Sequence, residues 1–425
     1  MRTRLSRFLQ STSVWQSLIV FVGVMLANAL GYIYHMLCSR RLGIEEYGVL
    51  ATLVAGYSMF GAVVAVLTTI TAKFTAEFVA LDDQPRMRML ARTMMRVCCL
   101  KALAVSVVAF FALPVLSVYL HIDTPTLAVG IAAIATSFLL PAWRGMLQGL
   151  QAYRELAIST TLEAILRVLS GVAFAWWGYG AFGAMTGFVV GNVFSLAYTW
   201  YALRRHVAIG NNQMLLALDL RRLVQTSAHI VLSTTALTSI GFVDVLLARH
   251  FLSAQDAGLY GVLSLTGKII IFSVSFLPTI LLPKAVALVA RGESAQQILW
   301  RAITVTIGFS GIVVALYFAI PTLIVKVMAG SAFLAVAPSV GWYGVATALL
   351  AATTLVATYK IGIHQFGFIP GLLLVAALEI MFISYFHRDI AMIVQLVIWA
   401  NLAALLATVL PERVAKRAAV SQGIG

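Results

Sequence analysis

Residues 97–120 read VCCLKALAVSVVAFFALPVLSVYL, and Lys101 is the only charged residue among them. At about 1.5 Å per residue, a helix of this length spans the ~30 Å hydrocarbon core of a bilayer. Eleven further stretches are similar, and 61% of the chain is hydrophobic, only 10% is charged, and the mean hydropathy is +0.98. We therefore predict an all-α polytopic membrane protein with about twelve transmembrane helices. The predicted spans are 14–37, 48–72, 97–120, 126–149, 158–178, 181–203, 224–249, 258–283, 301–325, 339–360, 363–386 and 391–410.

Basic residues are unevenly distributed among the connectors. The N-terminal tail, alternate connectors and the C-terminal tail hold 21 of the 29 Lys and Arg residues, so we predict that both termini are cytoplasmic. The net charge of +14 is explained by this topology and by contact with anionic lipids, and it gives no support for nucleic-acid binding. Two basic amphipathic stretches, 73–96 and 284–298, are expected to lie along the cytoplasmic face as interfacial helices.

The chain also looks like two halves. LGIEEYGVL at Leu42–Leu50 has a counterpart in LSAQDAGLY at Leu252–Tyr260, at an offset of 210 residues. Six predicted spans separate the two copies, an even number, so the halves share one orientation. We predict two six-helix bundles, at 1–203 and 224–425, joined by a cytoplasmic linker at 204–223.

Three short motifs carry a family resemblance. LGIEEYG follows the first span, a D-x-x-x-x-R…A-G-L-Y pattern runs from Asp244 to Tyr260, and Pro278 and Pro283 close the eighth span. In these motifs and in its layout the chain resembles polysaccharide-biosynthesis flippases of the multidrug/oligosaccharidyl-lipid/polysaccharide exporter superfamily.

The resemblance implies a fold and a task. The two bundles would form a V-shaped central cavity in the bacterial plasma (inner) membrane. By alternating access they would carry undecaprenyl-pyrophosphate-linked oligosaccharide from the cytoplasmic to the periplasmic leaflet. Lipid II flippases of this superfamily usually have two extra helices, which we do not find here, so the resemblance favours O-antigen, capsule or exopolysaccharide repeat units. Anionic lipids and other polysaccharide assembly proteins are further expected partners, and no cofactor is expected.

Charged residues at membrane depth are expensive and are candidates for function. Arg167 lies near the middle of the fifth predicted span, four residues after Glu163 on the same helical face. One interpretation is a pair that simply neutralises itself. The other places Arg167 in the cavity, where its planar guanidinium binds the diphosphate, and makes Glu163 a candidate for ion coupling.

Asp244 and Lys268 form a second candidate pair, near the outer ends of the seventh and eighth spans. They are expected close enough for the long lysine side chain to bridge the two helices. A structural ion pair is one interpretation. The alternative is a coupling switch, in which protonation of Asp244 frees Lys268 to bind substrate and biases the carrier toward one face.

Four further residues complete the predicted site. Arg144 follows Pro141, which is expected to break the fourth helix. Arg40 and Arg41 form a basic pair on the side where basic residues are scarce, and a departing diphosphate would pass them. Glu379 in the eleventh span is a second candidate for proton coupling, with a buried, satisfied carboxylate as the alternative.

Two other classes of protein remain open. A multidrug or small-metabolite exporter of the same superfamily needs a smaller cavity lined with carboxylates and aromatic side chains. A membrane polysaccharide polymerase needs a sizeable outward loop, and the outward connectors here are short. The histidines have no metal-ligand spacing and no GxxxxGK[ST] motif occurs, so neither a metal site nor ATP hydrolysis by a P-loop is expected.

Overall fold

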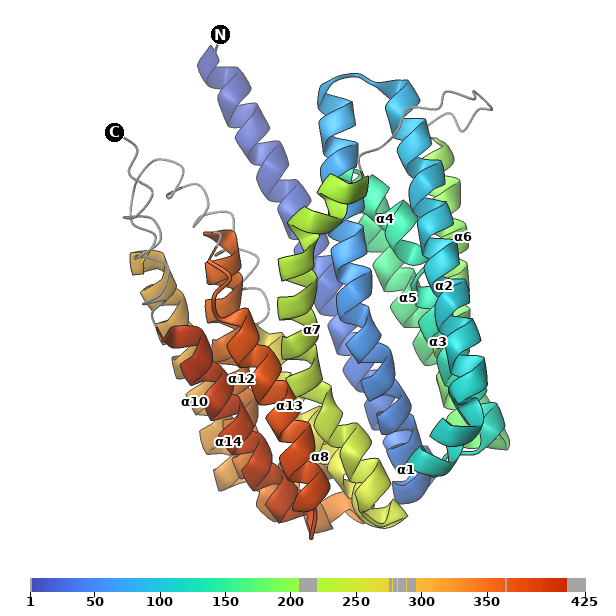
Figure 1. The fold of residues 1–425 in the computed structure, drawn as a ribbon, viewed down its shortest axis with the longest axis vertical. Helices are drawn as coiled ribbons and strands as arrows, with labels where there is room; N and C mark the ends of the chain where they lie inside the picture. Colours follow the sequence, from blue (N-terminus) through green and yellow to red (C-terminus); the bar gives the residue numbers. More distant parts are fainter. Residues whose placement is uncertain are drawn as a thin grey trace. The chain divides into compact units, whose positions relative to one another are not determined.

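The computed structural model describes residues 2–205, 220–274, 277, 281, 288, 296–363 and 365–410, and every regular element among them is a helix. The chain divides into two compact units (Figure 1). Unit 1 comprises Met1–Ser227 and Val327–Ala332, and unit 2 comprises Ala228–Lys326 and Phe333–Gly425. The predicted linker at 204–223 lies mostly outside the described residues, and its bounds stay a prediction.

Unit 1 begins with α1, Arg2–Ala80, which contains two of the predicted spans. Gly43 interrupts it with a φ of 77°, and Figure 1 shows the chain reversing direction within α1. A positive φ is accessible to glycine without the steric cost that a Cβ imposes. The LGIEEYG motif therefore contains the turn that joins the first two spans.

The segment predicted to lie flat on the membrane, 73–96, instead belongs to two long helices. α1 continues to Ala80, and α2, Gln84–Leu120, begins after Asp83, whose side chain accepts a hydrogen bond from the Arg86 N–H at 2.9 Å. The prediction is wrong because the apolar residues of this stretch, such as Met87 and Met94, pack in a core with α4 and α6 and not on lipid. Most of its counterpart, 284–298, lies outside the described residues.

The rest of unit 1 surrounds the candidate site. The remaining helices are α3 (Thr124–Ser137), α4 (Leu140–Gly149), α5 (Tyr153–Phe174), a π-helical turn η1 (Ala175–Tyr179) and α6 (Gly180–Arg204). The break expected near Pro141 is present between α3 and α4. A Cβ on Gly187 would lie 2.6 Å from the Arg167 carbonyl oxygen, and one on Gly191 would lie 2.7 Å from that of Glu163. Glycine at these two positions lets α6 approach the backbone of α5.

Unit 2 contains most of the later helices. They are α7 (Leu220–Phe251), α8 (Ala254–Val274), α10 (Gln296–Ala319), α11 (Pro321–Met328), a 3-10 helix η2 (Ser331–Val336), α12 (Ala337–Gly362), α13 (Ile369–Tyr385) and α14 (Ile390–Val409). Its core joins α7, α12, α13 and α14 through buried side chains that include Ile240, Leu350, Leu372 and Ala404. Within α11 and η2, Val327–Ala332 belong to unit 1.

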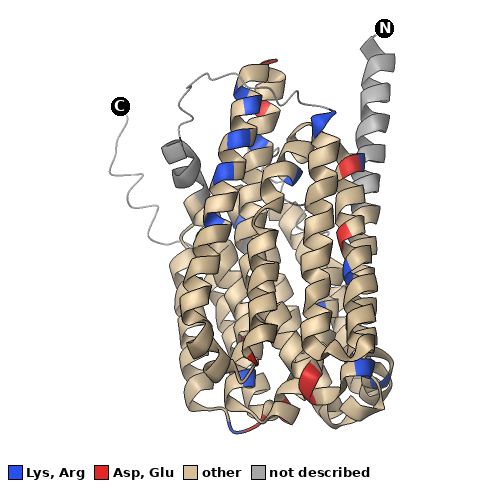
Figure 2. Cartoon of the chain, turned by 90° about the vertical axis from the view of Figure 1, so that its right-hand side faces the viewer, with Lys and Arg blue, Asp and Glu red and all other residues tan. Residues whose placement is uncertain are grey.

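Among the described residues, nine helical segments are long and apolar enough to cross a membrane, and α13 is a shorter apolar helix. Two of the nine, Met25–Ala80 and Tyr153–Arg204, are interrupted at Gly43 and Gly178, so each of them contains two apolar helical segments. Figure 2 shows that Lys and Arg are denser at one end of the helices and that charges are sparse along the middle. The chain is therefore a multi-pass membrane protein, as predicted.

Candidate substrate site

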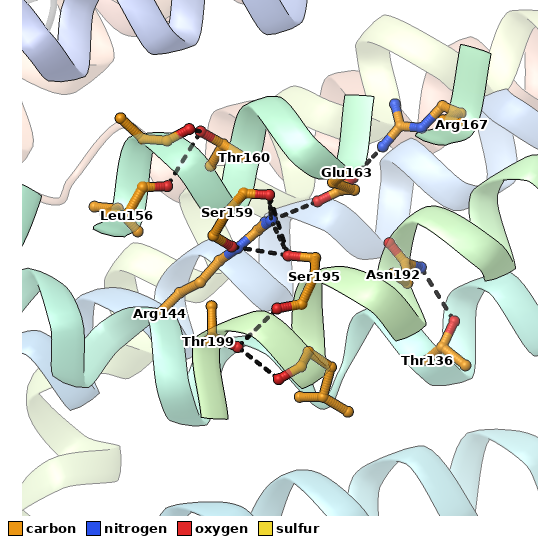
Figure 3. Close-up of polar contacts among 12 residues, drawn as sticks. Thr136, Arg144, Leu156, Ser159, Thr160, Glu163, Arg167, Asn192, Ser195 and Thr199 are labelled. Carbon is orange, nitrogen blue, oxygen red and sulfur yellow. Dashed lines mark hydrogen bonds and ion pairs between the residues drawn. The ribbon is translucent and has the colours of Figure 1, made fainter. Parts of the chain in front are cut away.

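A buried carboxylate held by two arginines lies in unit 1 (Figure 3). Glu163 on α5 is only 7% exposed. Its Oε2 accepts a hydrogen bond from Arg144 Nη2 at 2.7 Å, and its Oε1 accepts one from Arg167 Nη2. The local pairing of Glu163 with Arg167 is as the sequence suggests, but the second partner comes from α4. The cluster therefore holds two positive charges against one negative charge.

Arg144 donates most of its hydrogen bonds to side chains of the protein itself. Its Nε donates to Ser159 Oγ at 3.0 Å, and its Nη2 donates to Ser195 Oγ at 2.7 Å as well as to Glu163. The two serine hydroxyls are 2.8 Å apart and both serines are fully buried. Arg144 thus ties α4 to α5 and α6, which is the geometry of a positioning residue.

Arg167 is partly exposed, and one of its N–H groups forms no hydrogen bond with a described residue. Its guanidinium carbon lies 4.2 Å from the centre of the Phe188 ring, a cation–π contact, and its side chain is 20% exposed. Its Nε is buried and has no hydrogen-bond partner in the described part of the chain. Arg167 therefore makes fewer hydrogen bonds to the protein than Arg144 does, and its side chain is partly exposed.

A second polar contact beside this cluster was missed from the sequence. Asn192 on α6 donates to the Ala133 carbonyl at 3.0 Å and to Thr136 Oγ1 at 3.1 Å, and it accepts from Tyr57 at 3.3 Å. Asn192 shares a helical face with Ser195, three residues later, and this spacing of polar residues in an apolar span was a signal that could have found them.

Arg40 and Arg41 bind backbone carbonyls at helix ends. Arg40 Nη2 donates to the Val327 carbonyl at 2.8 Å, and Arg41 Nη2 donates to the Trp176 carbonyl at 3.2 Å. Glu46 accepts a hydrogen bond from the Ala181 N–H at 2.7 Å, at the N-terminus of α6. These contacts give the basic pair a structural use, and its role toward substrate stays a prediction.

In unit 2 the expected bridge between Asp244 and Lys268 is not formed. Asp244 is 1% exposed, and its Oδ2 accepts hydrogen bonds from the hydroxyls of Tyr260 and Tyr343, both at 2.7 Å. Lys268 Nζ lies 4.0 Å from the centre of the Phe242 ring. The direct ion pair is absent because two buried tyrosine hydroxyls occupy the carboxylate, and the role of the two residues as a coupling switch stays a prediction.

Glu379 on α13 is a buried carboxylate without a hydrogen bond or ion pair to a described residue. It is 2% exposed, and neither carboxylate oxygen has a hydrogen-bond partner among the described residues. The alternative of a satisfied carboxylate is therefore wrong for this residue. Glu379 lines a cavity of about 350 Å³ whose walls are otherwise apolar and include Phe382 and Trp399. Asn401 on α14 is also buried, with its Oδ1 unpaired in the same described part of the chain.

Several solved structures of membrane transporters have a fold similar to that of this chain. A multidrug resistance MATE family transporter of the MOP superfamily, in an inward-facing conformation, matches with a TM-score of 0.80 and 13% identity, over 96% of this chain and 99% of that chain. The lipid II flippase MurJ gives 0.69 at 14% identity over 93% and 86%. A MOP superfamily transporter from Pyrococcus furiosus gives 0.64 at 14% identity over 96% and 95%. The chain has the polytopic helical fold of these transporters.

The family follows from the sequence match. The model of the polysaccharide biosynthesis protein family matches residues 14–285, more than half of the chain. The chain therefore belongs to that family. None of the curated proteins compared with the chain matches it.

Proposed function

We propose that the protein is a flippase that moves polyprenyl-diphosphate-linked oligosaccharide repeat units from the cytoplasmic to the outer leaflet of a bacterial inner membrane, for surface polysaccharide assembly. The observation that carries the proposal is the net positive cluster of Arg144, Glu163 and Arg167 inside a membrane protein of the polysaccharide biosynthesis family. A diphosphate is the anionic part of such a substrate.

Arg167 binds the diphosphate in this proposal. A planar guanidinium offers paired donors to phosphate oxygens, and the Arg167 side chain is 20% exposed. Arg144 and Glu163 hold Arg167 in place, so Glu163 acts as a positioning residue more than as an ion-coupling one. The two six-helix bundles rearrange around the bound head group in alternating access, with both termini in the cytoplasm.

Asp244 and Glu379 are the ion-coupling residues of this proposal. A carboxylate at membrane depth is costly when ionised and unpaired, so Glu379 gains stability by binding a proton or another cation. Asp244 already has two tyrosine donors and is the less responsive of the two.

A small-molecule exporter is the second candidate. The apolar cavity that Glu379 helps to line favours it, because apolar walls suit a lipophilic small molecule.

The test is the accumulation of undecaprenyl-pyrophosphate-linked oligosaccharide on the cytoplasmic leaflet of a deletion strain. We expect wild type to relieve it, Arg167→Lys to relieve it only in part because lysine keeps the charge without the paired donors, and Arg167→Ala to fail. Lys101→Ala, which removes an exposed cation from α2, is the matched control and should complement fully. A deletion strain with no accumulation and intact surface polysaccharide would contradict the flippase and favour export of small molecules.

A further inference from the structure

Lys268 lines a cavity in unit 2 that the proposed diphosphate site does not include. The cavity has a volume of about 240 Å³ and lies between α7, α8 and α12. At ~30 Å³ per water molecule it has room for about eight waters, which suits one sugar ring and is far too small for an oligosaccharide. Its polar lining consists of Ser233, Thr234, Thr238, Lys268, Thr354 and Thr358.

The threonine hydroxyls of this wall can only accept hydrogen bonds from a ligand. Each donates its single proton to the backbone carbonyl four residues earlier, as Thr234 does to Ile230 at 2.7 Å and Thr358 does to Thr354 at 2.8 Å. A hydroxyl oxygen whose proton is engaged retains only lone pairs for other partners. The wall therefore favours a ligand rich in donors, as the hydroxyls of a sugar are.

Two further groups in the cavity make no hydrogen bond or ion pair with a described side chain, although Asp244 is a nearby carboxylate for one of them, Lys268. Ser233 is 0% exposed, and its Oγ has no hydrogen bond. Lys268 makes no ion pair with a described carboxylate, and its Nζ instead lies over the Phe242 ring. A buried hydroxyl without a partner gains a hydrogen bond from a ligand, and an ammonium at membrane depth favours an anionic one.

We infer that this cavity binds a single acidic sugar of the transported head group, with the carboxylate of the sugar against Lys268 and its hydroxyls donating to the threonines. The inference rests on the proposed flippase function and adds a substrate class to it, repeat units that contain a uronate. Phe242 and Phe272, which also line the cavity, supply flat surfaces for the apolar face of the ring.

The experiment measures binding to the intact protein in lipid nanodiscs. The probes are undecaprenyl diphosphate without a sugar and the same lipid carrying glucose or glucuronate. We expect wild type to bind the glucuronate lipid about tenfold more tightly than the glucose lipid, the gain of one charge-assisted hydrogen bond. Lys268→Met should abolish that preference and Lys268→Arg should keep it. Arg167→Ala should weaken all three lipids together.

Lys101→Met is the matched control, because it removes a lysine from an exposed face of α2. Equal affinity of wild type for the glucose and glucuronate lipids would overturn the inference while leaving the flippase proposal intact. An equal loss for all three lipids in Lys268→Met would also overturn it, since Lys268 would then bind the diphosphate. Failure of wild type to bind even the bare lipid would instead contradict the proposed function itself.

Discussion

Glu163 on α5 and Glu379 on α13 are both buried carboxylates, in the fifth and the eleventh predicted spans, yet their surroundings differ. Glu163 accepts hydrogen bonds from two arginines. Glu379 has no polar partner among the described residues and faces an apolar cavity. A clamped carboxylate keeps its charge and fixes its neighbours, whereas an unpaired one at membrane depth is stable only when a proton or cation joins it.

The contrast extends to the other buried acid of unit 2. Asp244 accepts hydrogen bonds from the neutral donors Tyr260 and Tyr343, and no described lysine or arginine forms an ion pair with it. Unit 1 therefore carries an excess of positive charge at its polar cluster, whereas Asp244 and Glu379 of unit 2 form no ion pair with a described lysine or arginine. Such an arrangement suits an anionic substrate at Arg167 and a proton or cation at Glu379.

The largest expected effect comes from neutralising the two glutamates in turn. Glu163→Gln leaves the partly exposed Arg144 and Arg167 as neighbouring like charges without their shared carboxylate, and we expect the free energy of unfolding to fall by about 3 kcal/mol. Glu379→Gln removes a carboxylate that nothing pairs with, so the free energy of unfolding should stay the same or rise. Thermal unfolding in nanodiscs measures both, with exposed Glu45→Gln as the control.

The same two variants separate stability from transport. Glu379→Gln should fold normally and yet lose any dependence of flipping on a proton or cation gradient in reconstituted vesicles. A destabilised Glu379→Gln protein would show that the carboxylate has a structural partner, and the comparison between the two glutamates would fail.

A smaller effect is expected from the tyrosines that stabilise Asp244. Tyr343→Phe removes one of the two tyrosine hydrogen bonds to a buried carboxylate, and we expect a loss of about 1.5–3 kcal/mol in the free energy of unfolding. Tyr317 is the matched control, since its hydroxyl donates to the neutral Thr266 carbonyl at 2.6 Å, and Tyr317→Phe should cost only about 0.5–1.5 kcal/mol. Equal losses would mean that Asp244 is uncharged in the folded protein.

Much of the fold could be predicted, because a bilayer imposes length and hydropathy on each helix. The spans and the break near Pro141 follow from local sequence. The prediction of an interfacial helix at 73–96 was wrong, because an amphipathic pattern does not show whether the apolar face contacts lipid or protein. Here Met87 packs in the core of unit 1.

The candidate site was predicted only where partners are neighbours in the chain. Glu163 and Arg167 are four residues apart on one helix, so their contact is a local fact. Arg144 reaches Glu163 from 19 residues away, and Tyr343 reaches Asp244 from 99. Such pairs depend on how the helices pack. A single sequence carries no signal for which of its many tyrosines or arginines will contact a given carboxylate.

The smallest expected effect on stability concerns Arg41, an exposed cation that contrasts with the more enclosed Arg144 and Arg167. Its guanidinium donates to the Trp176 carbonyl at 3.2 Å, in the π-helical turn before α6. Because solvent screens an exposed charge, we expect Arg41→Gln to lower the free energy of unfolding by less than about 1 kcal/mol. If flipping is also unchanged, Arg41 is a helix-end contact and nothing more. A loss of flipping at unchanged stability would instead support the predicted role of Arg40 and Arg41 in passing the diphosphate outward. Cations that bind the substrate would then lie outside the cluster of Arg144, Glu163 and Arg167 as well as within it.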